Sequence, residues 1–388
     1  MLKLLFPTRK TKSIKPSPFF RNQTLLDAMH DMGDPAADTV FSKLLSEGDI
    51  DKTNAVLRLL VQNDNSLSGN VPPILKAFLV ANSALPTWAD KNKIQRAQEM
   101  FTSQGAFFGL VLMSLSLPIL YAGGKGGSQV LSGTGQLTGH FRRRASQTLR
   151  FILDTMEPGG LNPDGKGLRA IQKVRLMHAA IRHYAHHSPM WKNRSAWGQP
   201  INQEELAGTL LAFSSVAIDG LHQLDIEFSA EDEECYLHTW KVIGHLLGVC
   251  TEMLPHNMED ARELWMQIKE RNFVATPEGH QLALDHLAFL KDMVPGHLFD
   301  SLPASLMHFL MGGKISHGIL GLPRPGWTYF IIAWIRALFD LEGKIVLSSK
   351  TLRKLTSAAG ELLMESLYHY WNEGDGSPFQ IPKGLDKV

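Results

Sequence analysis

The chain has 388 residues, 44% of them hydrophobic, which is enough to bury a large core. Its formal net charge is +1, so no overall positive field favours nucleic acid, and we expect no nucleic-acid partner. With only two cysteines, Cys235 and Cys250, the sequence excludes a disulfide framework and a multi-cysteine zinc or iron–sulfur site.

The N-terminal segment is basic. Residues 1–21 hold six lysines and arginines and no acidic residue, and their apolar run Leu4–Phe6 is too short for the core of a signal peptide. We therefore interpret residues 1–22 as a disordered or loosely attached tail of a cytoplasmic protein. Contact of this tail with an anionic membrane surface is the alternative.

Residues 105–124, GAFFGLVLMSLSLPILYAGG, carry no charge and are about long enough to cross a bilayer. Pro118 and the glycines at both ends favour a buried central helix instead, and a membrane span is the alternative.

Most of the remaining chain follows the helical period, and strand alternation is nearly absent. Helices with start signals are expected over residues 49–63, 202–221, 231–254, 257–272, 276–293 and 348–371. Asn202 and Glu205 have the spacing of a capping box. The sequence predicts a single large all-α domain over residues 23–375 and a C-terminal tail over residues 376–388.

Residues 173–187, KVRLMHAAIRHYAHH, hold four histidines. On a helix, His178 falls in the middle of the apolar stripe, and Arg175 and Arg182 lie side by side along one edge of that stripe. Two guanidiniums beside a buried face need anionic partners. A haem would suit this arrangement, with the imidazole on the iron and the arginines on the propionates. The alternatives are a structural core histidine and salt bridges from both arginines to Asp or Glu.

The other histidines of this stretch, His183, His186 and His187, are interpreted as the solvated end of the helix. His183 and His187 are four residues apart and could hold a metal, although they do not form the H-E-x-x-H zinc motif. His238 and His245 lie on nearly one face of a later helix and form a reserve pair for ligation.

A second helix, over residues 140–156, has polar side chains on its apolar face. Arg144 and Thr148 share that face one turn apart, and Gln147 flanks it. Such a pattern suggests a lined cavity with a few placed hydrogen-bonding groups. The alternative is a buried Arg144 paired with an acidic residue, for example within residues 231–234.

The sequence resembles the latex clearing proteins and the wider group of related haem oxygenases. The matching pieces are GDPAADTVFSKL (33–44), GGSQVLSGTGQL (126–137), R-x-x-Q-T (144–148), VRLMHAAIR (174–182), WGQPINQEELAGTLLAFS (197–214) and YLHTWKVIGHLLGV (236–249). The VRxxHaxxR element, thirty residues after Thr148, is the most specific of them.

This resemblance implies a globin-like helical core that holds a b-type haem, with His178 as the proximal axial ligand. It implies that Arg144, Gln147 and Thr148 lie in the distal or cofactor pocket. It also implies that dioxygen is the co-substrate and that a carbon–carbon double bond of a hydrophobic isoprenoid is cleaved.

Two departures from the latex clearing proteins weigh against cleavage of rubber itself. Gln147 stands where those proteins have a lysine, and Ser128 stands where rubber-cleaving members have a glutamate. We therefore expect a haem b oxygenase acting on a hydrophobic small molecule. A non-catalytic haem sensor or carrier, and an all-α protein without a cofactor, are the alternatives.

Overall fold

The structure is a computed structural model that describes residues 23–47, 72–133, 141–187, 191, 195–293, 299–330 and 332. Its elements, in chain order, are α2 (Gln23–His30), α3 (Pro35–Glu47), α5 (Pro73–Ala81), α6 (Lys91–Ser103), α7 (Gly105–Val111), the π-helical turn η1 (Leu112–Ser116), α8 (Leu117–Leu120), α9 (Gly127–Gly133), α10 (Phe141–Met156), α11 (Lys166–His187), η2 (Ser195–Trp197), α13 (Gln203–Phe213), α14 (Ser215–Gln223), α15 (Ala230–Leu246), η3 (Thr251–Met253), α16 (Met258–Asn272), α17 (Pro277–Asp292), α18 (Leu302–Met311) and α19 (Gly313–Ser316).

The prediction of an all-α protein is confirmed. The described residues contain no β-strand, and one isolated bridge joins Gly123 and Phe273. Local chemistry explains where several helices begin, because a capping side chain accepts a backbone N–H of the first turn. These caps are Asp90, Asn202, Ser229, Asn257 and Thr276.

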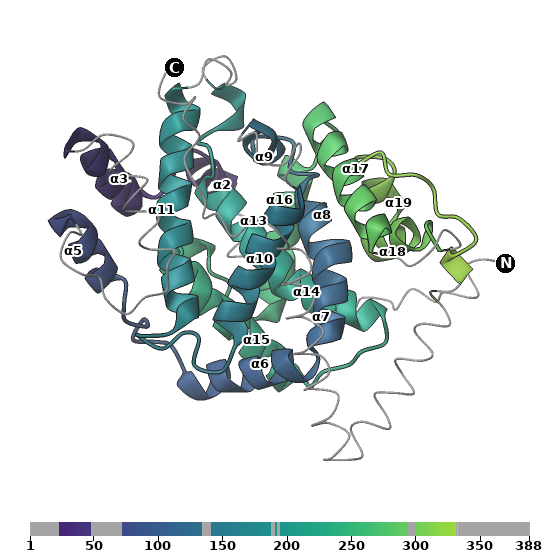
Figure 1. Ribbon diagram of the computed structural model, residues 1–388, viewed down its shortest axis with the longest axis horizontal. Coiled ribbons are helices and arrows are strands. Elements are labelled where there is room, and N and C mark those ends of the chain that lie inside the picture. Colours follow the sequence, from purple (N-terminus) through teal and green to yellow (C-terminus); the bar gives the residue numbers. More distant parts are fainter. Residues whose placement is uncertain are drawn as a thin grey trace.

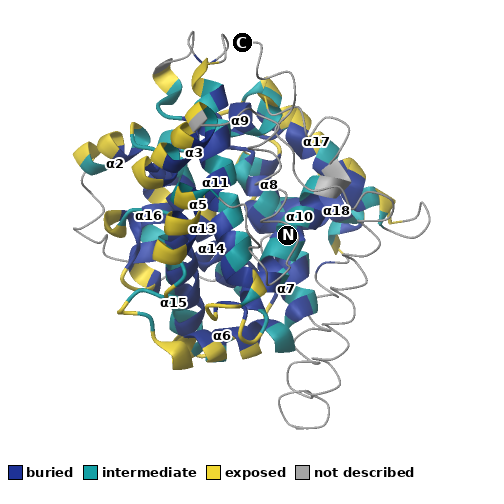
Figure 2. Ribbon diagram, turned by 60° about the vertical axis from the view of Figure 1, so that its left-hand side comes forward, coloured by how far each residue is buried: buried dark blue, intermediate teal, exposed yellow. Residues whose placement is uncertain are grey.

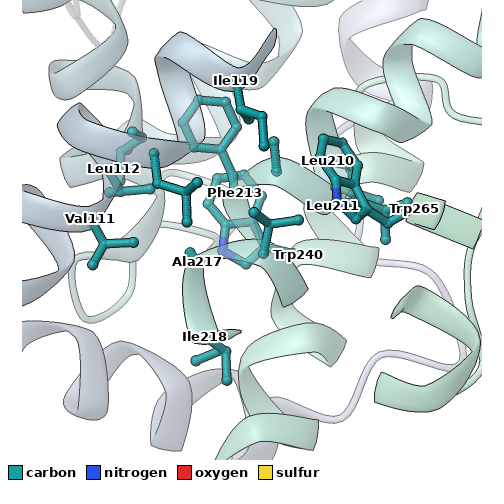
Figure 3. Close-up of a cluster of buried hydrophobic side chains, with 14 of the residues drawn as sticks. Val111, Leu112, Ile119, Leu210, Leu211, Phe213, Ala217, Ile218, Trp240 and Trp265 are labelled. Atoms are coloured by element: carbon teal, nitrogen blue, oxygen red, sulfur yellow. The ribbon is translucent and has the colours of Figure 1, made fainter. Parts of the chain in front are cut away.

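The core surrounds α13 and α14. Most residues of both helices are buried, which is the pattern of a helix enclosed by others. Residues of α7, η1, α8, α15 and α16 pack around them, as Figure 3 shows for Val111, Leu112, Phe213, Trp240 and Trp265. Figure 2 shows buried residues toward the centre of the molecule and exposed residues on its rim.

The predicted helix over residues 202–221 is broken into α13 and α14 at Ser214. The Ser214 hydroxyl donates to the carbonyl of Leu210 at 2.8 Å, and its backbone leaves the helical region at φ −107° and ψ −94°. Serine can bond to the backbone in this way and so compete with a regular helix.

The uncharged stretch at residues 105–124 forms α7, η1 and α8, and most of its apolar side chains are buried against the core. Within the described part of the chain, no single helix is long and apolar enough to cross a membrane. The α6 helix and the following segment Gly105–Leu120 pass that test only as a pair, and they are bent by 84°.

On one side of the core, α11 lies between α10 and α3, and α5 packs against α3 (Figure 1). Leu176, Ala179 and Ala180 of α11 form a second, smaller hydrophobic cluster with α3 and α5. The histidine-containing helix therefore presents one face to this cluster and another to the interior.

Several sequence predictions lie wholly or partly outside the described residues. They are the basic tail at residues 1–22, the helices at residues 49–63 and 348–371, the end of the domain at 375, and the C-terminal tail at 376–388. These, and the cytoplasmic location inferred from the tail, stay predictions. The globin-like character of the core also stays a prediction.

Candidate functional site

A cavity of about 340 Å³ lies between α8, α10, α11, α13 and α16. Its volume falls in the range typical of ligand and cofactor sites. Its walls are mainly apolar, and its apolar and aromatic lining includes Leu117, Leu120, Val130, Phe151, Val174, Ile181, Leu206, Phe213, Trp240 and Trp265. The few polar side chains on its walls are therefore the candidates for chemistry.

His178 of α11 lines this cavity, flanked by Val174, Met177 and Ile181. Its Nδ1 atom is buried and has no hydrogen-bond partner among the described residues. Burial, together with the positive charges of Arg182 and Arg144, lowers the pKa of His178 to about 3. The imidazole is therefore neutral at physiological pH, which is the form that binds a metal ion.

Arg144 of α10 lines the same cavity, and its guanidinium is buried enough that desolvation lowers its pKa. No acidic side chain among the described residues pairs with it. The acids proposed as partners are engaged elsewhere, since Glu231 and Asp232 pair with Arg96, and Glu233 with Arg262. A buried cation without a counter-charge is costly, so this cavity wall is suited to an anionic group.

Gln147 and Thr148 complete the polar wall contributed by α10. The Thr148 hydroxyl donates to the carbonyl of Arg144 at 3.0 Å, which leaves its oxygen lone pairs as acceptors. The Gln147 amide can both donate and accept. The structure thus brings His178, Arg144, Gln147 and Thr148 to one cavity, from two adjacent helices.

Arg175 and Arg182 do not line this cavity. Arg175 makes a two-point ion pair with Asp34, with Nε–Oδ2 at 2.6 Å and Nη2–Oδ1 at 3.0 Å. Its Nη1 donates to the Asn82 side chain at 2.7 Å, and it faces a separate surface hollow of about 430 Å³.

Arg182 is buried and pairs through Nε with Asp38 at 2.8 Å. Both arginines therefore adopt the salt-bridge arrangement that was the alternative in the sequence analysis. Their guanidiniums are engaged by Asp34 and Asp38, and the pairing of these arginines with cofactor propionates stays a prediction.

The remaining histidines of α11 are at its outer end. The Nδ1 atom of His187 lies 2.6 Å from the carbonyl of His183, and His186 bonds to Gln199. His238 and His245 both contact the ring of Trp88 edge-on, and neither lines the cavity. No group of three potential ligands among His, Cys, Asp and Glu occurs in the part of the chain that the structure describes.

Sequence reasoning missed five polar residues that line the cavity, which are Tyr121, Lys125, Glu205, Thr209 and Asn272. Tyr121 bonds through its hydroxyl to Nδ1 of the buried His286 at 3.1 Å. Glu205 was interpreted only as the third residue of a capping box. A helical wheel for α13 offers no signal for it, since this helix is buried on nearly all sides.

The fold and cavity define an all-α protein with a mainly apolar pocket that presents a neutral imidazole and a buried arginine without an acidic partner among the described residues. The family model described as "ER-bound oxygenase mpaB/B'/Rubber oxygenase, catalytic domain" matches residues 95–344, and the chain belongs to this oxygenase family. The resemblance stated from the sequence is thereby confirmed.

Two relatives extend the match. The chain is 27% identical over 329 residues to the rubber oxygenase of Streptomyces sp. (strain K30), covering 81% of this chain and 77% of that protein. It is also similar in fold to a structure of latex clearing protein LCP in the closed state, with a TM-score of 0.75 at 23% identity, over 91% of this chain and 95% of that chain.

Proposed function

We propose that the protein is a haem b-dependent oxygenase that uses dioxygen to cleave a carbon–carbon double bond in a hydrophobic, isoprenoid-type molecule. The observation that carries this proposal is the neutral His178 imidazole on the wall of a mainly apolar cavity, with a buried Nδ1 that has no partner among the described residues. An imidazole in this state fits the axial ligand of a haem iron.

A haem held by His178 would supply the binding of dioxygen and its activation toward a double bond. The residues of α10 would provide the polar surroundings. Arg144, which has no acidic partner among the described residues, would neutralise a carboxylate of the cofactor or negative charge that develops on oxygen during the reaction. Gln147 would donate an amide N–H, and Thr148 would accept through its oxygen.

The apolar walls support a hydrophobic substrate. They would bury the hydrocarbon body and exclude water from the reacting bond, which strengthens every polar interaction inside the cavity. Ser128, which by the resemblance stated from the sequence stands where rubber-cleaving members have a glutamate, is completely buried against Thr276 and does not line the cavity. This position therefore offers no acid–base group, and we propose a substrate other than rubber.

The test is an absorption spectrum of protein produced with haem precursor, recorded oxidised, reduced, and reduced with carbon monoxide. We expect a haem spectrum and a carbon monoxide complex, both lost or strongly shifted in His178→Ala. The matched control is His186→Ala, which removes an exposed histidine from the same helix and should leave the spectrum unchanged.

Oxygen uptake and carbonyl products are then measured with unsaturated isoprenoids and lipids. Product formation that depends on His178 supports the oxygenase. A haem spectrum without product from any of these compounds would favour a haem sensor or carrier. A protein that stays colourless with added haemin, or a spectrum indifferent to His178→Ala, would contradict the haem assignment.

A further inference from the structure

The side chain of Glu205 places a carboxyl group at the wall of the cavity. Its Oε1 atom is buried and has no hydrogen-bond partner among the described residues, although the side chain borders the cavity. The atom lies over Gly126 and Gly127, where added Cβ atoms would stand 2.7 and 3.5 Å from it. Glycine at position 126, with φ +116°, therefore makes room for this carboxyl group.

Helix capping accounts for only some of the hydrogen bonds that this carboxyl group can make. The Asn202 side chain accepts from the Glu205 N–H at 2.9 Å, and the backbone N–H groups of Ile201 and Asn202 act on the Glu205 carboxylate, as in a capping box. These backbone donors leave Oε1 unused. The neighbouring Glu204 accepts hydrogen bonds at Oε1 from Arg271 and Asn272, and its Oε2 lies 3.3 Å from Nδ1 of His30.

The environment of Glu205 favours its protonated form. Burial raises the pKa of Glu205 to about 8, and the neighbouring charge of Glu204 acts in the same direction. The positive charge of His30 and the backbone donors lower the pKa of Glu205 and so act against this shift. The exposed Lys125 lines the same cavity. At neutral pH the group is therefore mainly a carboxylic acid, which can donate one hydrogen bond and accept others.

We propose that Glu205 is a specificity-determining residue that hydrogen-bonds an oxygen atom, a hydroxyl or a carbonyl, on an otherwise hydrophobic ligand. This inference rests on the proposed function, because it concerns the ligand of the same cavity. A pure hydrocarbon that displaced water from the cavity would leave the buried Oε1 unpaired, whereas an alcohol or carbonyl compound would satisfy it. The preferred substrate class is thus an oxygenated isoprenoid.

The test compares two probes with the same carbon skeleton, farnesol and farnesene, of which only farnesol carries oxygen. Binding to the protein as purified is followed by quenching of tryptophan fluorescence, since Trp240 and Trp265 line the cavity, and by the Soret band wherever haem is present. We expect about tenfold tighter binding of farnesol, the size of one hydrogen bond to a buried group. Glu205→Leu should abolish this preference.

Glu205→Gln provides a second measurement that does not depend on the leucine variant folding, because glutamine keeps the capping box. Wild-type affinity for farnesol should fall as the pH rises through about 8, since an ionised carboxylate resists the loss of cavity water. The glutamine variant should keep a constant affinity.

Equal affinities for the two probes in the wild type, a preference that survives Glu205→Leu, or an unchanged pH dependence in Glu205→Gln would each overturn the inference. These outcomes are separable from failure of the proposed function. A protein without haem that still prefers farnesol contradicts only the haem assignment, and a haem protein without the preference contradicts only the role of Glu205.

Discussion

Arg182 donates a hydrogen bond from Nη1 to the carbonyl oxygen of Ile201 at 3.0 Å. Ile201 has a φ of 51°, a conformation that a β-branched residue rarely adopts. Arg182 stands one turn after His178 on α11, and Ile201 immediately precedes the N-cap of α13. This single bond therefore couples the helix that carries the imidazole to the turn before α13, the helix that carries Glu205.

Replacing Arg182 should loosen this coupling. Arg182→Lys keeps the charge but cannot reach Asp38 and the Ile201 carbonyl together, because lysine lacks the planar fork of arginine. We expect a loss of about 1–3 kcal/mol in the free energy of unfolding, measured with a chemical denaturant. Lys166→Ala, which removes a half-exposed ion pair at 3.9 Å, is the control and should change little. Equal effects of the two substitutions would contradict the bracing role.

Replacing Arg144 or Arg175 by leucine should have very different effects on the stability of the protein. Arg175→Leu leaves the buried Asp34 carboxylate unpaired and should cost about 3–5 kcal/mol of stability. Arg144→Leu leaves no acidic partner behind among the described residues, so the haem-free protein should lose less than about 1 kcal/mol or gain stability. Ligand or haem retention should nevertheless fall in Arg144→Leu. A destabilisation as large as that of Arg175→Leu would show that Arg144 is a structural residue.

The raised pKa of Glu205 predicts a pH dependence of stability. Between its ordinary value near 4.5 and about 8, the folded protein holds a proton that the unfolded chain has lost. The contribution of Glu205 to stability is therefore fully present below about pH 4.5 and is lost as the pH rises to about 8.

Glu205→Gln should remove this slope, so that its stability relative to wild type is higher at pH 8.5 than at pH 5 by about 1–3 kcal/mol. Thermal or denaturant unfolding of both proteins at each pH measures the difference. The buried His178 and His286, whose pKa values are lowered, contribute equally to both proteins and cancel. A stability difference between the two proteins that does not depend on pH would show that Glu205 is ionised in the folded state.

The hydrogen bond between Tyr121 and His286 joins the cavity wall to the core. Both residues are buried, and desolvation lowers the pKa of His286 to about 3, so the imidazole stays neutral. Tyr121→Phe removes the hydroxyl and leaves Nδ1 of His286 without it, at an expected cost of about 1–2 kcal/mol in unfolding free energy. Chemical denaturation measures this loss. An unchanged unfolding free energy in Tyr121→Phe would indicate that water replaces the hydroxyl.

Much of the candidate site could be predicted from local periodicity. The helical repeat is enough to place His178 in the middle of an apolar stripe and to put Arg144 and Thr148 on one buried face, because side-chain direction on a helix follows from residue spacing alone. Capping residues such as Asn202 also bond to backbone groups only a few residues away, so they can be recognised from the local sequence. These features, together with the family resemblance, predicted the all-α fold and the cavity residues of α10 and α11.

Only the tertiary structure decides which acidic residue pairs with each buried arginine. Arg175 and Arg182 were recognisable as arginines in need of anions, yet their partners Asp34 and Asp38 lie 141 and 144 residues away in the chain. The free carboxyl oxygen of Glu205 likewise depends on the packing of Gly126, the residue just before α9, against this side chain of α13. Periodicity specifies which face of a helix is buried, whereas the packing of distant segments determines which charges are neutralised there and which stay open to a ligand.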